Sequence, residues 1–488
     1  MMTLRLHVFS ISCHFFFCFF ALSFLVTTIV SQPYRRPDQI ETLLAFKNEF
    51  GRCNNSVARS WIRDAIAFDG VVFDSETGVV TKLDLRGGCL KDTLGGNSSL
   101  FKFHHLRYLD LSYNNINSSS FLAELGRLTN LDSLDLSNND LVGKVPSSIS
   151  NLSRLTYLDL SSNNLNSSIP LLYNLTKLSS LDLSNNRLKG KVPEWLCNLP
   201  SLTALSLSHN SLDSFQGSQK EVFLNSSLVY LYLTSNAFHG PFPTIPETMR
   251  YMVASNNDFT GEIPLSLCNP KNLSVLDFSN NNFSGSVPSC LSESLTVLNL
   301  RDNKLRRLPD MIFGAIDFSG NRLEGQIPES IGLLKSLIAL DLSNNRFMGY
   351  IPSSFGKLTN LESLDLSRNQ LSGRIPQELA TLTFLEYVNL SQNKLTGPIP
   401  QSTQIVGQNG SSFEGNVDLC GLPLKKGCFG KNVAPTTLIQ RSKSLKQEQV
   451  LSWKAAAIGY GPGVVFGIAV GQVIATYKPV LFFKLFHL

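Results

Sequence analysis

The sequence predicts an α/β repeat fold, a solenoid of about fourteen stacked coils, and three observations support this prediction. A leucine-rich motif recurs along most of the 488 residues. Its period of 20 to 30 residues is typical of coils that each contain a strand and a turn. Charged residues make up only 16% of the chain and the net charge is +5, so no strong field favours nucleic acid. Together these features indicate one continuous repeat array rather than several separate domains.

The repeat unit reads Leu-x-x-Leu-x-Leu-x-x-Asn-x-Leu, with one clear copy at Leu155, Leu158, Leu160, Asn163 and Leu165. The Leu-x-Leu alternation predicts a short strand whose leucines point inward. We expect the Asn amide to lie buried after the strand, where it bonds the backbone of neighbouring coils. The Asn recurs at Asn114, Asn139, Asn163, Asn186, Asn210, Asn236, Asn257, Asn281, Asn303, Asn321, Asn345, Asn369 and Asn393.

Most copies continue as Gly-x-(Ile/Val)-Pro, as at Gly143 to Pro146 and Gly373 to Pro376. Gly permits a tight turn, and Pro fixes φ where the chain leaves the strand. With this extension the repeats resemble the plant-specific class of extracellular leucine-rich repeats. The resemblance implies a right-handed leucine-rich-repeat solenoid of plant-type repeats, with an extra short sheet on its flank.

The N-terminus has the pattern of a secretory signal peptide over residues 1–31. An apolar run extends from Val8 to Val30, and Ser31 is a small residue suited to cleavage. A polar stretch that contains Pro33 begins at once, which favours cleavage. The alternative is an uncleaved membrane anchor.

Residues 412–428 resemble the C-terminal cap of plant leucine-rich-repeat receptors, and the resemblance implies that Cys420 pairs with Cys428. Residues 455–477 are apolar or small and would span about 35 Å as a helix, enough to cross a bilayer. Trp453 and Tyr477 are typical residues for the two interfaces. The alternative of a buried soluble helix is weak, because nothing else remains for such a helix to pack against.

The membrane segment contains Gly459, Gly463, Gly467 and Gly471, one every four residues. Small residues at this spacing let two helices approach closely, although Gly is also common in membrane helices. The stretch from Gly459 to Gly471 resembles the membrane segment of plant receptor-like proteins. That family has a receptor ectodomain and a membrane helix but no kinase, which implies a receptor-like kinase adaptor as partner through this helix.

The sequence thus divides into six predicted parts. Residues 1–31 form the signal peptide, 32–79 the N-terminal cap, 80–405 the repeat domain, 406–454 the C-terminal cap and juxtamembrane linker, 455–477 the transmembrane helix and 478–488 a short cytoplasmic tail. We expect a single-pass type I protein of the plasma membrane with its repeats outside the cell.

Seven cysteines follow the signal peptide, so at least one is unpaired within the chain. Cys268 and Cys290 lie on successive coils outside the strands, where a disulfide would join neighbours. Cys197 is then expected to be a buried apolar filler. Cys53 and Cys89 either pair with each other or stay without partners.

Three features depart from the family pattern. In the N-terminal cap, the helix expected over Leu43 to Phe50 is kept, but Arg35 and Phe73 stand where cysteines are expected. The step from Asn303 to Asn321 is only 18 residues, which suggests that coils were lost at the junction 306–315. The stretch before the membrane segment is basic, whereas the family usually has an acidic one.

The residue between the two strand leucines points outward, on the concave face that solenoids commonly use for binding. In most coils this residue is Asp, but three successive coils carry Ser206, Tyr232 and Val253 instead. Tyr and Arg are favoured interface residues. We therefore predict a ligand-binding patch there, against the alternative of neutral drift. The predicted ligand residues are His209, Tyr230, Tyr232, Arg250 and Tyr251.

Eleven Asn-x-Ser/Thr motifs predict glycosylation, because so many motifs on a secreted chain are unlikely to stay unused. They begin at Asn54, Asn97, Asn117, Asn151, Asn166, Asn174, Asn225, Asn272, Asn282, Asn389 and Asn409.

We expect no enzyme, no cofactor and no metal, because the seven His residues are scattered without ligand spacing. The leading hypothesis is a surface receptor-like protein in plant defence or development. It would bind a peptide or protein ligand on the strand face and signal through a partner kinase. The alternatives are a non-signalling decoy or truncated receptor, and a secreted inhibitor of cell-wall-degrading enzymes.

Overall fold

The computed structural model describes residues 34–49, 57–65, 67–88, 90, 94–117, 119–218, 222–223, 225–293, 295–308 and 315–428. All of these residues belong to the first of the two units into which the chain divides, residues 1–428. The predicted signal peptide and membrane segment lie outside the described residues. The same holds for Cys53, Cys89 and Asn54.

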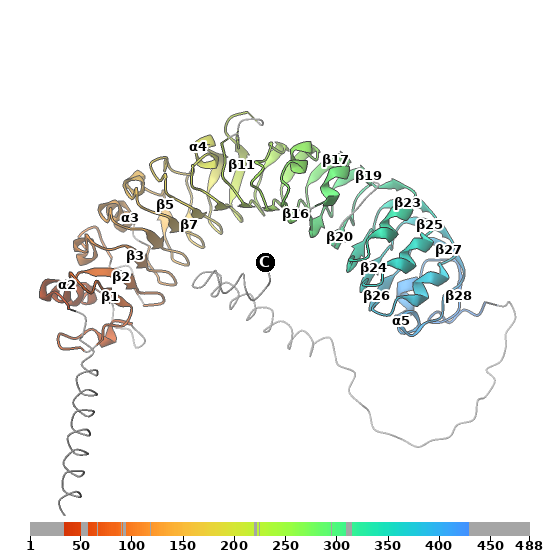
Figure 1. The fold of residues 1–488 in the computed structure, drawn as a ribbon, viewed down its shortest axis with the longest axis horizontal. Coiled ribbons are helices and arrows are strands. Elements are labelled where there is room, and N and C mark those ends of the chain that lie inside the picture. Colours follow the sequence, from red (N-terminus) through yellow and green to blue (C-terminus); the bar gives the residue numbers. More distant parts are fainter. Residues whose placement is uncertain are drawn as a thin grey trace, which may run out of the picture. The chain divides into compact units, whose positions relative to one another are not determined.

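A long sheet of fifteen strands runs through the first unit, and its strands follow one another in chain order (Figure 1). β1 pairs antiparallel with β2, and every later pair is parallel. This arrangement confirms the predicted stacking of coils. The strands are β1 (Val71–Phe73), β2 (Val80–Asp84), β3 (Tyr108–Asp110), β4 (Ser133–Asp135), β6 (Tyr157–Asp159), β8 (Ser180–Asp182), β10 (Ala204–Ser206), β12 (Tyr230–Tyr232), β14 (Tyr251–Val253), β16 (Val275–Asp277), β18 (Val297–Asn299), β20 (Ala315–Asp317), β22 (Ala339–Asp341), β24 (Ser363–Asp365) and β26 (Tyr387–Asn389).

Shorter sheets form a second surface, which we call the flank, just after the repeated Asn of each coil. The first two are pairs, β5 (Val142–Gly143) with β7 (Asn164–Leu165), and β9 (Lys189–Val192) with β11 (Ser211–Phe215). The third comprises β13 (His239–Pro241), β15 (Asp258–Glu262), β17 (Asn282–Ser286) and β19 (Lys304–Arg307). The fourth comprises β21 (Glu324–Gly325), β23 (Arg346–Gly349), β25 (Gln370–Gly373), β27 (Lys394–Pro398) and β28 (Asp418–Cys420).

Short helices complete many coils, and the Pro of the Gly-x-(Ile/Val)-Pro motif sets where several of them begin. Pro146, for example, has φ −72° and ψ 146° immediately before its helix, so its ring fixes the entry conformation. These helices are η2 (Ser99–Lys102), α3 (Ser119–Glu124), η3 (Leu125–Arg127), η4 (Ser147–Asn151), α4 (Glu194–Cys197), η5 (Leu265–Cys268), η6 (Ser289–Glu293), η7 (Glu329–Leu333), η8 (Ser353–Lys357) and η9 (Gln377–Thr381).

The repeated Asn joins each coil to the one before it, as the sequence predicts. The Nδ2 of Asn163 donates to the carbonyl oxygens of Leu136 at 3.0 Å and of Leu160 at 3.1 Å. Its Oδ1 accepts the backbone N–H of Leu141 at 3.0 Å. Asn163 is 7% exposed, so these bonds satisfy backbone groups that water does not reach. The inward leucines of successive coils form one continuous core.

The short junction does not interrupt this ladder. Leu305 donates its backbone N–H to Oδ1 of Asn321 at 3.0 Å, and Leu300 donates to the carbonyl of Asp317 at 2.8 Å. The coils on either side of the 18-residue step therefore stack like any other pair.

The N-terminal cap contains helix α2 (Pro37–Lys47) and η1 (Val57–Ser60). The helix expected over Leu43 to Phe50 is present, but its bounds differ, since α2 begins earlier and ends at Lys47. Pro37 is preorganised for a first helical position, and the adjacent Asp38 and the terminal Lys47 complement the helix dipole. Both positions where cysteines were expected lie close together, because the Arg35 guanidinium stands 5.4 Å from the centre of the Phe73 ring.

The C-terminal cap extends the Asn ladder by one step and then closes. Asn416 donates to the carbonyl of Leu390 at 2.9 Å and accepts the N–H of Leu395 at 3.0 Å. A disulfide joins Cys420 to Cys428, whose Cα atoms are 4.9 Å apart. The cap also contains α5 (Thr403–Val406) and η10 (Gly410–Phe413).

Candidate ligand-binding face

The outward residues of the long sheet form two columns in strict register. The third strand position aligns Asp135 with Asp159 and then with Asp182. The same column continues through Ser206, Tyr232 and Val253 and returns to Asp at Asp277. Side chains in one column are about 4.8 Å apart, so each contacts its neighbours in adjacent coils.

The aspartates of this column hold the turn that follows each strand. Oδ1 of Asp159 accepts the backbone N–H of Ser161 at 2.8 Å, and Oδ1 of Asp135 accepts that of Ser137 at 2.9 Å. The residue after each of these serines has a positive φ, 52° at Ser162 for example. The carboxylates therefore support a strained turn, and only part of each is available to a ligand.

The crowding of these carboxylates changes their acidity. Burial, with the charges of Asp135 and Asp182 alongside, raises the pKa of Asp159 to about 7. Burial likewise raises the pKa of Asp135 above its ordinary value. The Tyr157 hydroxyl donates to Oδ2 of Asp159 at 3.1 Å. Burial, together with that carboxylate, raises the pKa of Tyr157. This part of the face is a coupled acidic cluster rather than a row of independent charges.

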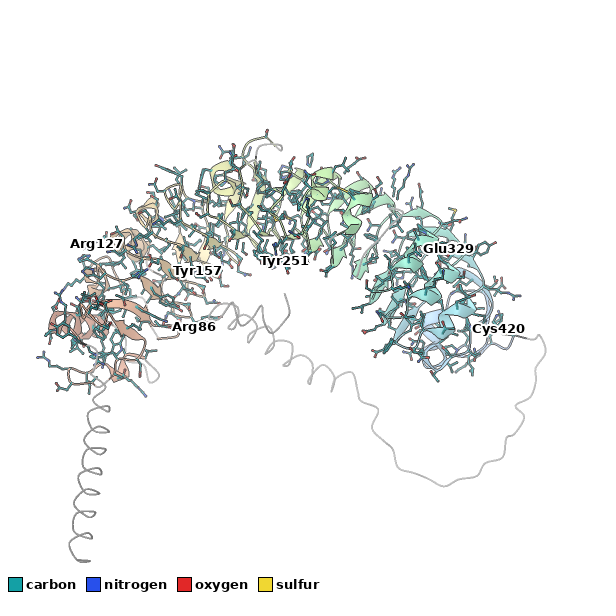
Figure 2. All side chains as sticks on the ribbon, in the orientation of Figure 1. Arg86, Arg127, Tyr157, Tyr251, Glu329 and Cys420 are labelled. Carbon is teal, nitrogen blue, oxygen red and sulfur yellow. A yellow bond between two sulfur atoms is a disulfide. The ribbon has the colours of Figure 1, made fainter. Side chains whose placement is uncertain are left out.

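The structure brings three of the predicted ligand residues together on β12 and β14. The rings of Tyr230 and Tyr251 stack with centroids 5.0 Å apart and an interplanar angle of 22°. Tyr232 lies in the next column and is half-buried, and burial beside the two stacked rings raises its pKa. Tyr251 lies on the same side of the row of coils as Tyr157 (Figure 2).

The other two predicted residues, Arg250 and His209, lie just before strand β14 and just after strand β10. Arg250 is exposed and directly precedes β14, where its carbonyl accepts the N–H of Ser274 at 2.8 Å. His209 is exposed in the turn after β10 with φ 55°. We call Tyr230, Tyr232, Arg250 and Tyr251 the tyrosine patch. His209 is not part of this patch. Its backbone N–H donates to the carbonyl oxygen of Thr234 in the neighbouring coil at 2.7 Å.

A polar hollow of about 270 Å³ lies farther along the face and was not predicted. Arg301 and Arg368 face into it from coils several steps apart, and Asp302 pairs with Arg301 at 3.0 Å. Apart from Asn389, which lies in the Asp column, its lining comes from the turn after each strand, two or three residues beyond that column. Comparing those turn positions across coils would have revealed the two arginines.

The remaining predicted sites are the cysteines and the glycosylation motifs. A disulfide joins Cys268 to Cys290, with Cα atoms 5.5 Å apart, and Cys197 is buried without a disulfide. Ten of the eleven asparagines that begin glycosylation motifs fall within the described residues. Asn389 differs from the others in its position, because it lies on strand β26 of the long sheet, where its Nδ2 donates to Asp365 at 3.0 Å.

Within residues 34–428, apart from the gaps given above, no helix is long and apolar enough to cross a bilayer. In the same part of the chain no group of three His, Cys, Asp or Glu side chains could hold a metal ion. The four glycines of the predicted membrane interface lie outside the described residues.

Three repeat families match the sequence. A family described as Leucine-rich repeat region matches residues 62–234. Two families described as Leucine rich repeat match residues 335–395 and residues 272–293. The matches cover coils on both sides of the tyrosine patch.

Curated relatives extend over the whole chain. Receptor-like protein 54 of Arabidopsis thaliana is 36% identical over 795 aligned residues, which cover 99% of this chain and 100% of the relative. Receptor-like protein 41 of the same plant is 54% identical over 268 residues, 52% of this chain and 30% of that protein. This chain therefore aligns with the full length of the first relative and with less than a third of the second.

Two solved structures share the fold. The crystal structure of PEPR1-AtPEP1 has a TM-score of 0.51 and 32% identity, and the match covers 61% of this chain and 46% of that one. A leucine-rich-repeat protein of Leptospira interrogans has a TM-score of 0.51 and 26% identity, covering 75% and 95%. This chain thus spans less than half of the first structure.

Proposed function

The chain belongs to the plant leucine-rich-repeat receptor-like proteins, and on that premise we propose that it binds a peptide or protein ligand on the tyrosine patch. The bound state is then passed to a partner receptor-like kinase through the membrane segment 455–477. The protein is a single-pass type I receptor of the plasma membrane with no catalytic activity of its own. Its role lies in plant defence or development.

One observation carries the ligand site. The aspartate column is interrupted in three successive coils by Ser206, Tyr232 and Val253, and elsewhere only in single coils, by Asn299 and Asn389. In the three successive coils two tyrosine rings stack, and the exposed Arg250 directly precedes one of them. Stacked rings lose little conformational entropy on binding, and Tyr with Arg supplies both apolar contact and hydrogen bonds. The acidic coils on both sides repel acidic partners, so the ligand contacts this patch with neutral or basic groups.

The ligand site is tested by capture from plant tissue. The tagged full-length protein is purified from plant membranes, and peptides that elute at low pH are identified by mass spectrometry. Tyr232→Ala with Arg250→Ala should lose peptides that the wild type retains, by at least tenfold in abundance. Tyr173→Ala with Arg187→Ala, which removes an exposed Tyr and Arg elsewhere, should retain them. Equal recovery from both double variants would refute the patch.

The signalling partner is tested in the same purification. A receptor-like kinase should co-isolate with the wild type and be lost when Gly463 and Gly467 are changed to Leu, because bulky side chains separate two closely packed helices. Retention of the kinase by that variant would place the contact elsewhere.

A truncated, non-signalling receptor is a second candidate. The alignment with Receptor-like protein 54 runs over 795 residues whereas this chain has 488, so the relative contains segments without a counterpart here. The 18-residue step at Asn303 to Asn321 is one place that supports such a loss. Recovery of a ligand without any kinase would favour this candidate. We also propose that the Asn-x-Ser/Thr motifs are glycosylated, which a mass shift on deglycosylation would test.

A further inference from the structure

A row of flat side chains crosses the flank of the last coils. Gln326, Tyr350 and Arg374 each follow the positive-φ glycine of their own coil. Each then lies over the corresponding glycine of the next coil. A Cβ added to Gly349 would stand 3.0 Å from Cγ of Gln326, and one on Gly373 would overlap the Tyr350 ring.

The same contact recurs one coil later, because a Cβ on Gly397 would stand 3.3 Å from Cγ of Arg374. The glycines therefore serve two purposes on this surface. They adopt a φ near +80°, and they leave room for a side chain from the preceding coil. An amide, a phenol ring and a guanidinium are laid side by side at the spacing of the coils, about 4.8 Å.

The outer face of this row is open. Tyr350 is 69% exposed although one side of its ring covers Gly373. Arg374 and Gln326 are exposed as well. A ring that is packed on one side and open on the other offers a rigid apolar surface at little entropic cost.

Positive charge surrounds the row. Arg346 and Lys394 are exposed on β23 and β27, and none of the ion pairs between described side chains involves either of them. We call Gln326, Tyr350, Arg374, Arg346 and Lys394 the flank strip. The preceding coils add further exposed basic residues at Lys304, Arg306, Arg307 and Arg322. Glu324, which aligns with Arg346, is an acidic residue within this surface.

The flank strip is also free of glycosylation motifs. Between residues 304 and 398 the sequence has one Asn-x-Ser/Thr motif, at Asn389, which lies on strand β26 of the long sheet. The flank of earlier coils carries such motifs at Asn166, directly after β7, and at Asn282, the first residue of β17. A large partner can therefore lie along the last coils without meeting a glycan.

We propose that the flank strip binds a linear acidic polysaccharide. A sugar ring places its apolar face on Tyr350, and its carboxylate pairs with Arg374 or Lys394, while Gln326 bonds hydroxyl groups. Such a polymer repeats one carboxylate on every sugar, so it can follow a surface that repeats with every coil. An extended acidic peptide fits less well, because its same-side residues are about 6.7 Å apart, out of step with coils at about 4.8 Å.

The site lies on a different surface from the tyrosine patch, so it is tested without the peptide ligand. The purified full-length protein in detergent is titrated with polygalacturonate while binding is followed by biolayer interferometry. Linear galactan serves as the neutral polymer and polyglutamate as the acidic peptide. The test variant combines Tyr350→Ala, Arg374→Gln and Lys394→Gln. The matched control, Lys189→Gln with Lys191→Gln, also removes two exposed positive charges from a flank strand.

Polygalacturonate should bind the wild type and the control with similar affinity, and the test variant at least tenfold more weakly. Affinity should fall as salt rises, since exposed charges are screened within about 10 Å at 0.1 M. Thermal unfolding of the test variant should match the wild type, because the three side chains are exposed. Equal binding of galactan or polyglutamate, or an equal loss in the control, would overturn the proposal. Absence of polygalacturonate binding to the wild type would also overturn it.

Discussion

Strands β3 to β8 and strands β10 to β14 share one backbone geometry but differ in the side chains that face outward. In the first stretch the third strand position is Asp in every coil, and each carboxylate accepts the N–H two residues later. In the second stretch Tyr232 and Val253 have no carboxylate with which to make that bond. Both stretches keep the repeated Asn, which is buried at Asn163 and half-buried at Asn236, and it bonds the preceding coil in the same way at both positions.

This difference distinguishes two kinds of hydrogen bond that stabilise the coils. The Asn ladder is common to both stretches and holds the stack together, whereas the Asp bond is an addition that a coil can lose. A position released from that structural role can carry a recognition residue, and tyrosine occupies it on β12. The tyrosine patch thus lies where the scaffold needs its outward residues least.

The largest expected effect on stability comes from removing the repeated Asn, which both stretches share. Asn163→Ala and Asn236→Ala should each lower the free energy of unfolding by about 3 kcal/mol, because each leaves several backbone groups without partners. The side chain of Asn236 donates to Leu207 at 3.0 Å and accepts from Leu212 at 3.0 Å, much as Asn163 does in its own coil. Chemical denaturation of the full chain measures both. A much smaller loss at Asn236 would mean that the two stretches do not share one scaffold.

A smaller effect is the pH dependence of the unfolding free energy, which should differ between the two stretches. The pKa of Asp159, about 7 in the folded protein, lies above the value of about 3.9 in an unfolded chain. The folded state therefore holds the proton more tightly between pH 4 and pH 7, and stability falls as pH rises through that range. The two pKa values differ by about 3, which corresponds to about 4 kcal/mol, and solvent screening of this partly exposed carboxylate reduces the expected loss to about 2 kcal/mol. Asp159→Asn should abolish that loss, measured as the difference in unfolding free energy between pH 4 and pH 8.

Tyr232→Phe is the matched change in the second stretch. Because burial raises the pKa of Tyr232 above its ordinary value, its hydroxyl stays protonated from pH 4 to pH 8. The variant should leave the pH dependence of stability unchanged. If Asp159→Asn and Tyr232→Phe gave the same pH profile as the wild type, the acidic cluster would not be coupled.

The sequence predicts those parts of this comparison that repeat with every coil. The positions of the strands, the inward leucines and the buried Asn follow from a motif read within one coil, because each coil is built in the same way. The register of the Asp column follows as well, since equal coils stack residue on residue.

Contacts between unlike residues of different coils could not be predicted in this way. The stacking of Tyr230 on Tyr251 depends on two rotamers in separate coils, and the pKa of Asp159 depends on burial by its neighbours. The packing of the Tyr350 ring over Gly373 likewise depends on side chains from two different coils. In the N-terminal cap, the proximity of Arg35 to Phe73 joins segments that have no repeat to align them.

The smallest expected effect comes from extending the Asp column by one coil into the second stretch. Ser206 is the first residue after the Asp column and aligns directly with Asp182. In Ser206→Asp the new carboxylate can accept the N–H of Ser208, as the aspartates before it do, but it also stands beside the charge of Asp182. Like charges at this distance raise each other's pKa, so the gain should hold at low pH and fade as both groups ionise.

Ser206→Asn is the control, because an amide oxygen can accept the same N–H without a charge. Between pH 5 and pH 8, Ser206→Asp should lose about 0.5 to 1 kcal/mol more unfolding free energy than Ser206→Asn. Denaturant titrations of the two variants at both pH values measure the difference. Equal losses would show that the acidic cluster ends at Asp182 for a reason other than charge. A larger loss would show that the coils of the tyrosine patch tolerate negative charge poorly, which would sharpen the expectation of a neutral or basic ligand.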